Sequence, residues 1–192
     1  MNRILLAVSL LFSRMTMAQT KGCMDPQATN YNKNATENDG SCLYKNTFFS
    51  PVKLCPVLSD TVQETSGLCY FNGMFWTHND SDNPPLLYAF DSLSGRILHQ
   101  IYIKNATNID WEDITHDKDY VYIGDFGNNS GTRKNLRILK IKKSDIHLQQ
   151  MTDSVNAEFI NFSMSDQTDF SDRFINNDHD IEALISFNDS LH

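Results

Sequence analysis

The stretch E-D-I-T-H-D-K-D-Y-V-Y-I-G-D, residues 112–125, contains a phrase that occurs three times in this chain of 192 residues. The other copies begin at Glu64, with E-T-S-G-L-C-Y-F-N-G-M-F-W-T-H-N-D, and at Glu182, with E-A-L-I-S-F-N-D-S-L-H. Each copy has a glutamate, an apolar residue two or four places later, a polar turn and a second apolar run. A repeat of this kind predicts an array of β-meanders.

The spacing of the three glutamates fits a repeat of four strands. The intervals are 48 and 70 residues, and a four-stranded propeller blade takes about 40–50 residues, so the longer interval indicates a blade with an insertion. Asn72-Gly73 is a strong hairpin signal. Residues 144–150 are the only candidate helical turn. Alternating apolar patterns and turn residues predict strands over 66–71, 74–78, 86–90, 96–103, 112–116, 120–125, 136–142 and 157–162.

The sequence therefore predicts an all-β fold, an incomplete β-propeller of about two and a half four-stranded antiparallel blades. The propeller part is expected over residues 47–192, truncated in its third blade. A propeller needs about four to eight blades to close, so the remaining blades are expected to be absent from this chain. Two explanations stay open, a truncated product of a longer gene and closure by self-association of open arrays.

Residues 1–18 have the pattern of a signal peptide. Arg3 provides a positive start, residues 4–12 are apolar, and Thr16-Met17-Ala18 ends in small residues, which predicts cleavage near Ala18. Arg14 interrupts the apolar run far short of the roughly 20 residues that a membrane span needs. We expect a secreted or cell-surface protein with no membrane span.

The charge of the chain limits its partners. Without Arg3 and Arg14 the chain keeps 14 basic and 24 acidic residues. So acidic a chain is not expected to bind nucleic acid through phosphate-neutralising contacts. Its loops are rich in Asp and Asn, whose oxygen atoms favour hard cations such as calcium, although most acidic loops are simply solvated.

A polar module is expected over residues 19–46. Cys23 and Cys42 bracket a stretch too polar to build a core, and export permits a disulfide between them. The alternating asparagines inside it resemble the first half of a calcium loop, although no glutamate closes the loop. Calcium binding and a plain disulfide-tied loop both remain open. The candidate ligands are Asp25, Asn30, Asn32, Asn34 and Asp39.

The other two cysteines allow two interpretations. Cys55 and Cys69 are 14 residues apart and could pair across a turn. Cys69 also lies where a strand residue is expected, and a free buried cysteine behaves as a small hydrophobe.

The repeated glutamates suggest a metal site. Because the inner strands of a propeller line its axis, Glu64, Glu112 and Glu182 are expected to lie near one another. Oxygen ligands at strand ends or loops are expected from Asn79, Asp80, Asp113 and Asp125. Converging carboxylates repel each other unless a cation or a shared proton compensates. The alternative is that the glutamates have a structural role in each repeat.

Catalytic signals are weak in this sequence. His78 and His116 occupy similar places in the first two copies, after the glutamate, and either could act as a general base. Neither a nucleophile elbow nor a zinc-protease signature occurs.

Two resemblances to known groups follow from these motifs. Residues 22–42 resemble a module of secreted bacterial proteins, often written G-C-x-D-x-x-A-x-N-Y-x-x-x-A-x-x-x-D-G-S-C, which is frequently calcium-associated and common in type IX secretion cargo. From residue 54 onward, E-T-S-G-L, W-T-H-N-D-S, N-I-D-W-E-D-I-T, Y-I-G-D-F-G-N-N and E-A-L resemble secreted bacterial β-propellers of six-bladed type. More distantly the chain is similar to calcium-dependent propellers of the gluconolactonase, strictosidine synthase and phytase-like groups. Those groups imply a calcium ion in the central channel.

Two functions from different classes remain. One is a secreted binding or scaffold module that presents its loops to a carbohydrate or protein ligand. The other is a calcium-dependent hydrolase of lactonase or phosphoesterase type, with the ion acting as Lewis acid. A chelator separates them, because the enzyme loses activity while the scaffold loses only stability.

Overall fold

The structure is a computed structural model that describes residues 19–53, 58–172 and 177–192. The chain forms two compact units, Met1–Val52 and Lys53–His192, so the division lies six residues beyond the predicted boundary at 46. None of the helices among the described residues is long and apolar enough to cross a membrane.

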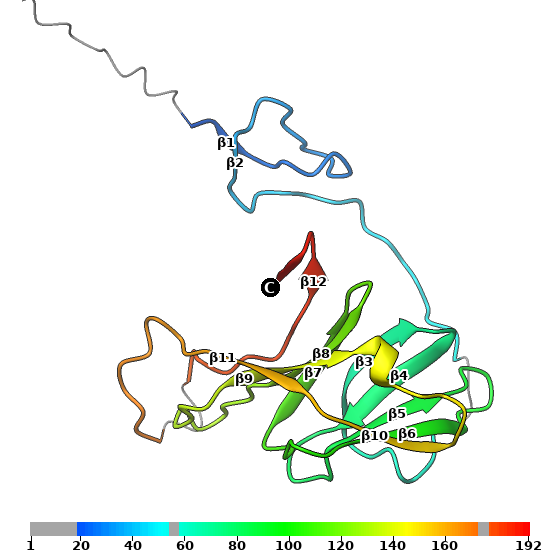
Figure 1. The fold of residues 1–192 in the computed structure, drawn as a ribbon. Helices are drawn as coiled ribbons and strands as arrows, with labels where there is room; N and C mark the ends of the chain where they lie inside the picture. The colour runs from blue at the N-terminus through cyan, green and yellow to red at the C-terminus, as the bar shows by residue number, and fades with distance from the viewer. Residues whose placement is uncertain (1–18, 54–57, 173–176) are drawn as a thin grey trace, which may run out of the picture. The chain divides into compact units, whose positions relative to one another are not determined.

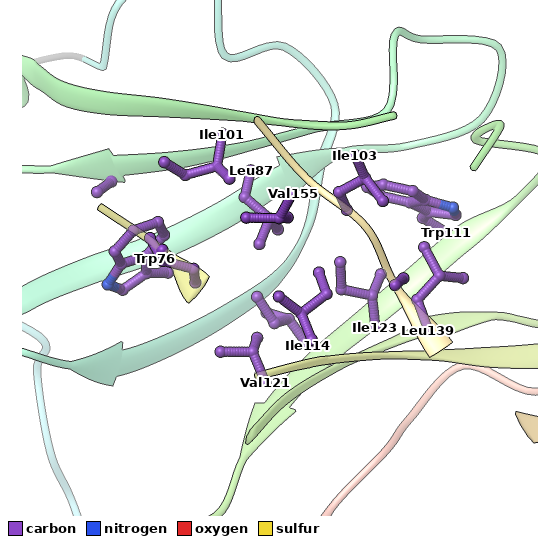
Figure 2. Close-up of a cluster of buried hydrophobic side chains, with 14 of the residues drawn as sticks. Trp76, Leu87, Ile101, Ile103, Trp111, Ile114, Val121, Ile123, Leu139 and Val155 are labelled. Carbon is purple, nitrogen blue, oxygen red and sulfur yellow. The ribbon is translucent and has the colours of Figure 1, made fainter. Parts of the chain in front are cut away.

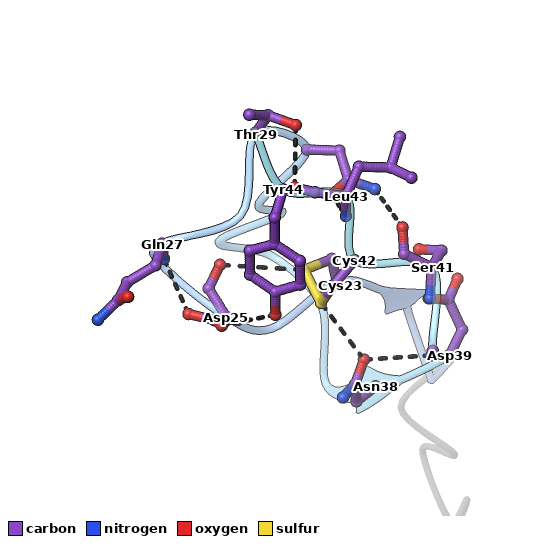
Figure 3. The surroundings of a disulfide bond; sticks show 12 residues. Cys23, Asp25, Gln27, Thr29, Asn38, Asp39, Ser41, Cys42, Leu43 and Tyr44 are labelled. Carbon is purple, nitrogen blue, oxygen red and sulfur yellow. Dashed lines mark hydrogen bonds between the residues drawn. A yellow bond between two sulfur atoms is a disulfide. The ribbon is translucent and has the colours of Figure 1, made fainter. Parts of the chain in front are cut away.

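The N-terminal unit is a loop closed by a disulfide. Its two short strands, β1 (Lys21–Gly22) and β2 (Glu37–Asn38), pair in parallel. Cys23 and Cys42 form the predicted disulfide, which is buried at the Cys23 side (Figure 3). Because this unit has little apolar side-chain area to bury, the crosslink is its main source of stability, about 3 kcal/mol for a loop of this size.

The first sheet is an antiparallel meander with an added parallel strand. Its strands lie in the order β10-β6-β5-β4-β3 (Figure 1). Asn72 and Gly73 both have positive φ and form the predicted tight turn between β3 and β4. The strands are β3 (Thr65–Phe71), β4 (Met74–Asn79), β5 (Leu86–Phe90), β6 (Ile97–Ile103) and β10 (Thr152–Val155).

The second sheet repeats the meander. Its strands lie in the order β11-β9-β8-β7, and all neighbours are antiparallel. A 3-10 turn, η1 (Lys143–Asp145), follows β9, where the sequence predicted a helical turn at 144–150. The strands are β7 (Trp111–His116), β8 (Tyr120–Asp125), β9 (Arg137–Lys142) and β11 (Glu158–Asn161).

The third copy of the phrase forms a short hairpin, which we call the C-terminal hairpin. It consists of β12 (Ser186–Phe187) and β13 (Ser190–Leu191). Asn188 and Asp189 form its turn, and both have positive φ.

The hydrophobic core lies between the first two sheets. Trp76, Leu87 and Ile101 of the first sheet pack with Ile123 and Leu139 of the second, and all five are fully buried (Figure 2). The opposite face of the second sheet carries a smaller cluster that includes residues near the C-terminal hairpin, namely Tyr122, Phe126, Leu136, Ile138 and Leu184. The first sheet, the second sheet and the C-terminal hairpin are therefore stacked in the order in which they occur along the chain.

One strand ties the two sheets together. After β9 of the second sheet the chain returns to the first sheet, where β10 pairs in parallel with β6, and then re-enters the second sheet as β11. Asn105 and the backbone of Ala157 exchange two hydrogen bonds where the chain leaves β10. The sequence did not predict β10, because its residues T-D-S-V have only one buried apolar side chain.

Strand pairing fixes the register of the repeat. Thr65 pairs with Asn79, and Trp111 pairs with Asp125, so the first two copies are offset by 46 residues. The turn at 188–189 corresponds to those at 72–73 and 118–119, which offsets the third copy by 70 residues from the second. Glu182 thus matches Glu112, but the first copy has Ser66 at this position, so aligning it on Glu64 was wrong by two residues.

The all-β class and the antiparallel meanders are confirmed. The assignment of these sheets to a propeller stays a prediction.

Candidate metal centre

Five carboxylates converge at one place in the β-sheet unit. They form two groups, Asp80 with Asp110 and Glu112, and Glu112 with Asp180 and Glu182. Within each group one oxygen atom of every residue lies within 4.8 Å of those of the others. Glu112 belongs to both groups and joins them.

Two of these residues, Asp110 and Glu112, lie at the start of β7 (Trp111–His116). Asp110 directly precedes β7 and Glu112 is its second residue, so their side chains leave the backbone on the same side. The Asp110 amide donates to Asp125 Oδ1, and its carbonyl accepts from the Gly127 amide. Ser66 Oγ lies 3.5 Å from Glu112 Oε2.

Asp80 is positioned by the backbone at the end of β4. Its amide donates to the Glu64 carbonyl, and its own carbonyl accepts from Asn108 Nδ2 at 2.7 Å. Asn108 also accepts from the Trp111 amide through Oδ1. This buried asparagine therefore links the strand end that carries Asp80 to the start of β7.

Asp180 is held by the loop after β8. The Asn128 amide donates to Asp180 Oδ1 at 2.6 Å, and Asn129 Nδ2 donates to Oδ2 at 2.8 Å. Asn128 also holds the residues before Asp180, through its side chain to the His179 carbonyl and through its own carbonyl, which accepts from Asn177 Nδ2.

Gly127 leaves room for the carboxylates. A Cβ atom at this position would lie far inside contact distance of Glu112 Oε1 and Asp110 Oδ2. Any side chain at residue 127 would therefore displace both carboxylates.

Burial and mutual repulsion shift the protonation of the cluster. Burial, followed by Glu182 and then the neighbouring aspartates, raises the pKa of Glu112 to about 8. Burial, and next the charge of Asp80, raises the pKa of Asp110 to about 6. Without a cation, Glu112 therefore keeps its proton at neutral pH. Carboxylate oxygens at these spacings are the ligands that hard divalent cations such as calcium prefer.

The predicted ligands divide into two sets. Glu112 and Glu182 lie together, whereas Glu64 is exposed and contributes only its backbone carbonyl. Asn79 accepts from the Gln63 amide and donates to the Thr61 carbonyl, which fastens the segment before β3. Asp125 is fully buried and already neutralised by two arginines, with Arg133 Nη2 at 3.0 Å and Arg137 Nε at 2.7 Å.

The two candidate catalytic histidines contact groups outside the carboxylate cluster. His78 is fully buried, its Nδ1 lies 3.1 Å from the Asn79 carbonyl, and burial lowers its pKa. His116 Nε2 lies 2.9 Å from the Tyr70 carbonyl, and its Nδ1 lies 3.0 Å from Lys143 Nζ. His116 therefore links β7 to β3. A catalytic role for either histidine stays a prediction.

The polar oxygens of the N-terminal loop stabilise its turns. They accept hydrogen bonds from backbone amides, as Asp25 does from Gln27 (Figure 3). Three further acceptors do the same: Asn32 accepts from Asn34, Asp39 from Ser41 and Asn30 from Leu43. Asn34 contributes its amide to one of these bonds. Calcium binding in this loop stays a prediction.

Cys69 is a free thiol on β3, and burial raises its pKa to about 12. Cys55, its predicted partner, lies outside the described residues.

The sequence prediction named Asp80 among the oxygen ligands but did not select Asp110 or Asp180 as site residues. A usable signal was present for both of the latter, because Asp110-Trp-Glu112 and Asp180-Ile-Glu182 share the pattern D-x-E. The 46-residue register places Glu64 and Ser66 at the corresponding positions of the first copy.

Comparison with known proteins gave no relative. No family model matches the chain, and no curated protein matches its sequence. The resemblance to secreted propellers and to type IX secretion cargo therefore stays a prediction from the motifs.

Proposed function

We propose that this chain is an exported binding or scaffold module of β-meander repeats whose sheets are joined by a divalent cation, with calcium the preferred ion. The observation that carries the proposal is the convergence of Asp80, Asp110, Glu112, Asp180 and Glu182, which come from three different segments of the chain. Glu112 belongs to both groups, so cation binding there connects the start of β7 to the end of β4 through the first group and to the segment before β12 through the second.

The surroundings of the cluster support a cation over a proton-sharing arrangement. Neighbouring groups fix the cluster from several sides, through the Asn128 and Asn129 bonds to Asp180 and the space left by Gly127. The two arginines nearby are already paired with Asp125, one on each carboxylate oxygen. A divalent cation would supply the positive charge that these converging carboxylates favour once they are ionised.

A binding module is favoured over the alternative calcium-dependent hydrolase. A hydrolase needs a base that reaches a water or substrate on the metal. His78 is fully buried, and both ring nitrogens of His116 lie within 3.0 Å of other groups. Carbohydrate or protein ligands on the loops remain the proposed partners.

Calcium titration followed by thermal unfolding tests the proposal. A ligand present at 100 times its Kd stabilises the folded state by about 2.7 kcal/mol, which corresponds to a Tm rise of roughly 5–10 °C for a chain of this size. The rise should be reversed by EDTA and abolished in Glu112→Gln and in Glu182→Gln. Glu64→Gln is the matched control, because Glu64 lies outside the cluster, and it should respond to calcium like the parent protein. An equal response in all four proteins would contradict the proposal.

A further inference from the structure

Two apolar faces of the β-sheet unit are exposed at positions that the same repeat buries elsewhere. The first, which we call the leading face, lies on β3 and β4 of the first sheet and contains the exposed Leu68 and Tyr70 and the half-buried Phe75. The second, which we call the trailing face, lies at the C-terminal hairpin and contains Ile185 and Phe187.

The leading face corresponds to the inner face of the second sheet. The 46-residue register places Leu68 at the position of Ile114 and Phe75 at that of Val121. The first sheet covers Ile114 and Val121, which are 3% and 0% exposed, whereas Leu68 is 58% exposed. Tyr70 is 55% exposed, although its ring lies only 5.0 Å from that of Phe75.

The trailing face corresponds to the covering face of the first sheet. Because the turns at 72–73 and 188–189 coincide, Phe187 takes the position of Phe71. Phe71 is 5% exposed, stacks on Trp76 and lies 5.4 Å from the ring of His116 in the second sheet. Phe187, in contrast, is 61% exposed.

The two exposed faces therefore repeat positions on the two sides of an interface that this chain already contains, and the trailing face repeats those at the end of β3. The face of Phe71 packs on the face of Ile114 and His116 between the first two sheets. The trailing face repeats the positions of the former, and the leading face repeats those of the latter. An interface built from such unlike halves joins copies head to tail.

We propose that a second copy of this chain covers these faces, so that the trailing face of one copy packs on the leading face of the next. Phe187 then lies beside Tyr70 of the next copy, as Phe71 lies beside His116 within one copy. The contact is apolar, and both copies are acidic, with a net charge of −8 for the whole chain. Salt screens this repulsion, so added salt strengthens the association, whereas it would weaken an ionic interface.

The test uses two variants that each block one face. Tyr70 and Phe187 suit it because neither lines the cavity of about 600 Å³ that Leu68 and Ile185 border in the same molecule. Tyr70→Lys blocks the leading face and Phe187→Lys the trailing face, both at exposed positions where folding is preserved. Leu93→Lys is the control, since Leu93 is even more exposed than Tyr70 and Phe187 but lies in the turn between β5 and β6.

The readout is molar mass by light scattering as a function of concentration. The parent and Leu93→Lys should exceed the monomer mass, and each blocked variant should shift this association to at least about ten-fold higher concentration. An equimolar mixture of the two blocked variants should form a dimer that does not grow further, because it has one intact interface. A parent chain that stays monomeric at high salt, or blocked variants that form no dimer on mixing, would overturn the proposal.

Discussion

Ser66 occupies in the first sheet the position that Glu112 occupies in the second, and its hydroxyl lies 3.5 Å from Glu112 Oε2. The small side chain at residue 66 leaves the first copy without a carboxylate of its own here. The carboxylates instead come from the second and third copies and from the end of β4.

Replacing this serine adds a sixth carboxylate to the cluster. Ser66→Glu should lower the Tm of the cation-free protein at pH 8, because the new charge repels Glu112. It should also enlarge the Tm rise that calcium produces, since one more oxygen ligand is available. Thermal unfolding with EDTA and with calcium measures both effects. Ser66→Gln has a similar size without the charge, and if it behaved like Ser66→Glu, crowding would be the cause.

The raised pKa of Glu112 predicts a pH dependence of stability without calcium. The folded protein holds the Glu112 proton up to about pH 8, whereas the unfolded chain releases it near 4.5. Stability should therefore fall as the pH rises from about 4.5 to 8. Glu112→Gln mimics the protonated form, so in EDTA it should exceed the parent Tm at pH 8 and match it near pH 4.5. A constant difference across this range would contradict the assignment.

The lowered pKa of His78 predicts a second pH dependence, a loss of stability as the pH falls. Burial lowers its pKa in the folded state, so below the ordinary value of 6.5 the unfolded chain binds a proton that the folded chain does not. Stability should decline as the pH falls below 6.5. His78→Leu should flatten this part of the profile in denaturant unfolding between pH 7 and 5. The exposed His147→Gln serves as control and should leave the decline in place.

Asp125 should be the most sensitive ion-pair residue of the second sheet. Asp125→Ala leaves Arg133 and Arg137, whose side chains are only 12% and 19% exposed, without their carboxylate. Breaking such a buried pair costs about 3–5 kcal/mol. Urea unfolding should show this loss, compared with at most about 1 kcal/mol for Glu158→Ala, which breaks an exposed pair with Lys140. Equal losses would mean that the buried pair contributes no more than the exposed one.

The meanders were predictable because their local signals agree. Alternating apolar residues and the Asn72-Gly73 turn located β3 and β4 to within one residue at each end. The disulfide followed from the polar composition between Cys23 and Cys42. In these segments short-range pattern and tertiary packing favour the same structure.

The composition of the metal cluster was only half predictable. Glu112 and Glu182 follow from the repeat, but a glutamate in the first copy, Glu64, misled the alignment because its neighbour Ser66 is the true counterpart. The strand pairing determines the 46-residue register, which cannot be read from a single sequence. Asp80 joins the cluster through the path of the chain after β4, which depends on the buried side chain of Asn108.

The return of the chain through β10 determines where the chain can be divided without removing a strand from one of the sheets. The segment that completes the second sheet, β11, can be reached only after β10 has been added to the first. Deleting the chain beyond Lys142 would thus remove an edge strand from both sheets at once. The unit of sequence duplication and the unit of folding therefore differ, because the repeat is one meander whereas each complete sheet also includes a strand from the later segment.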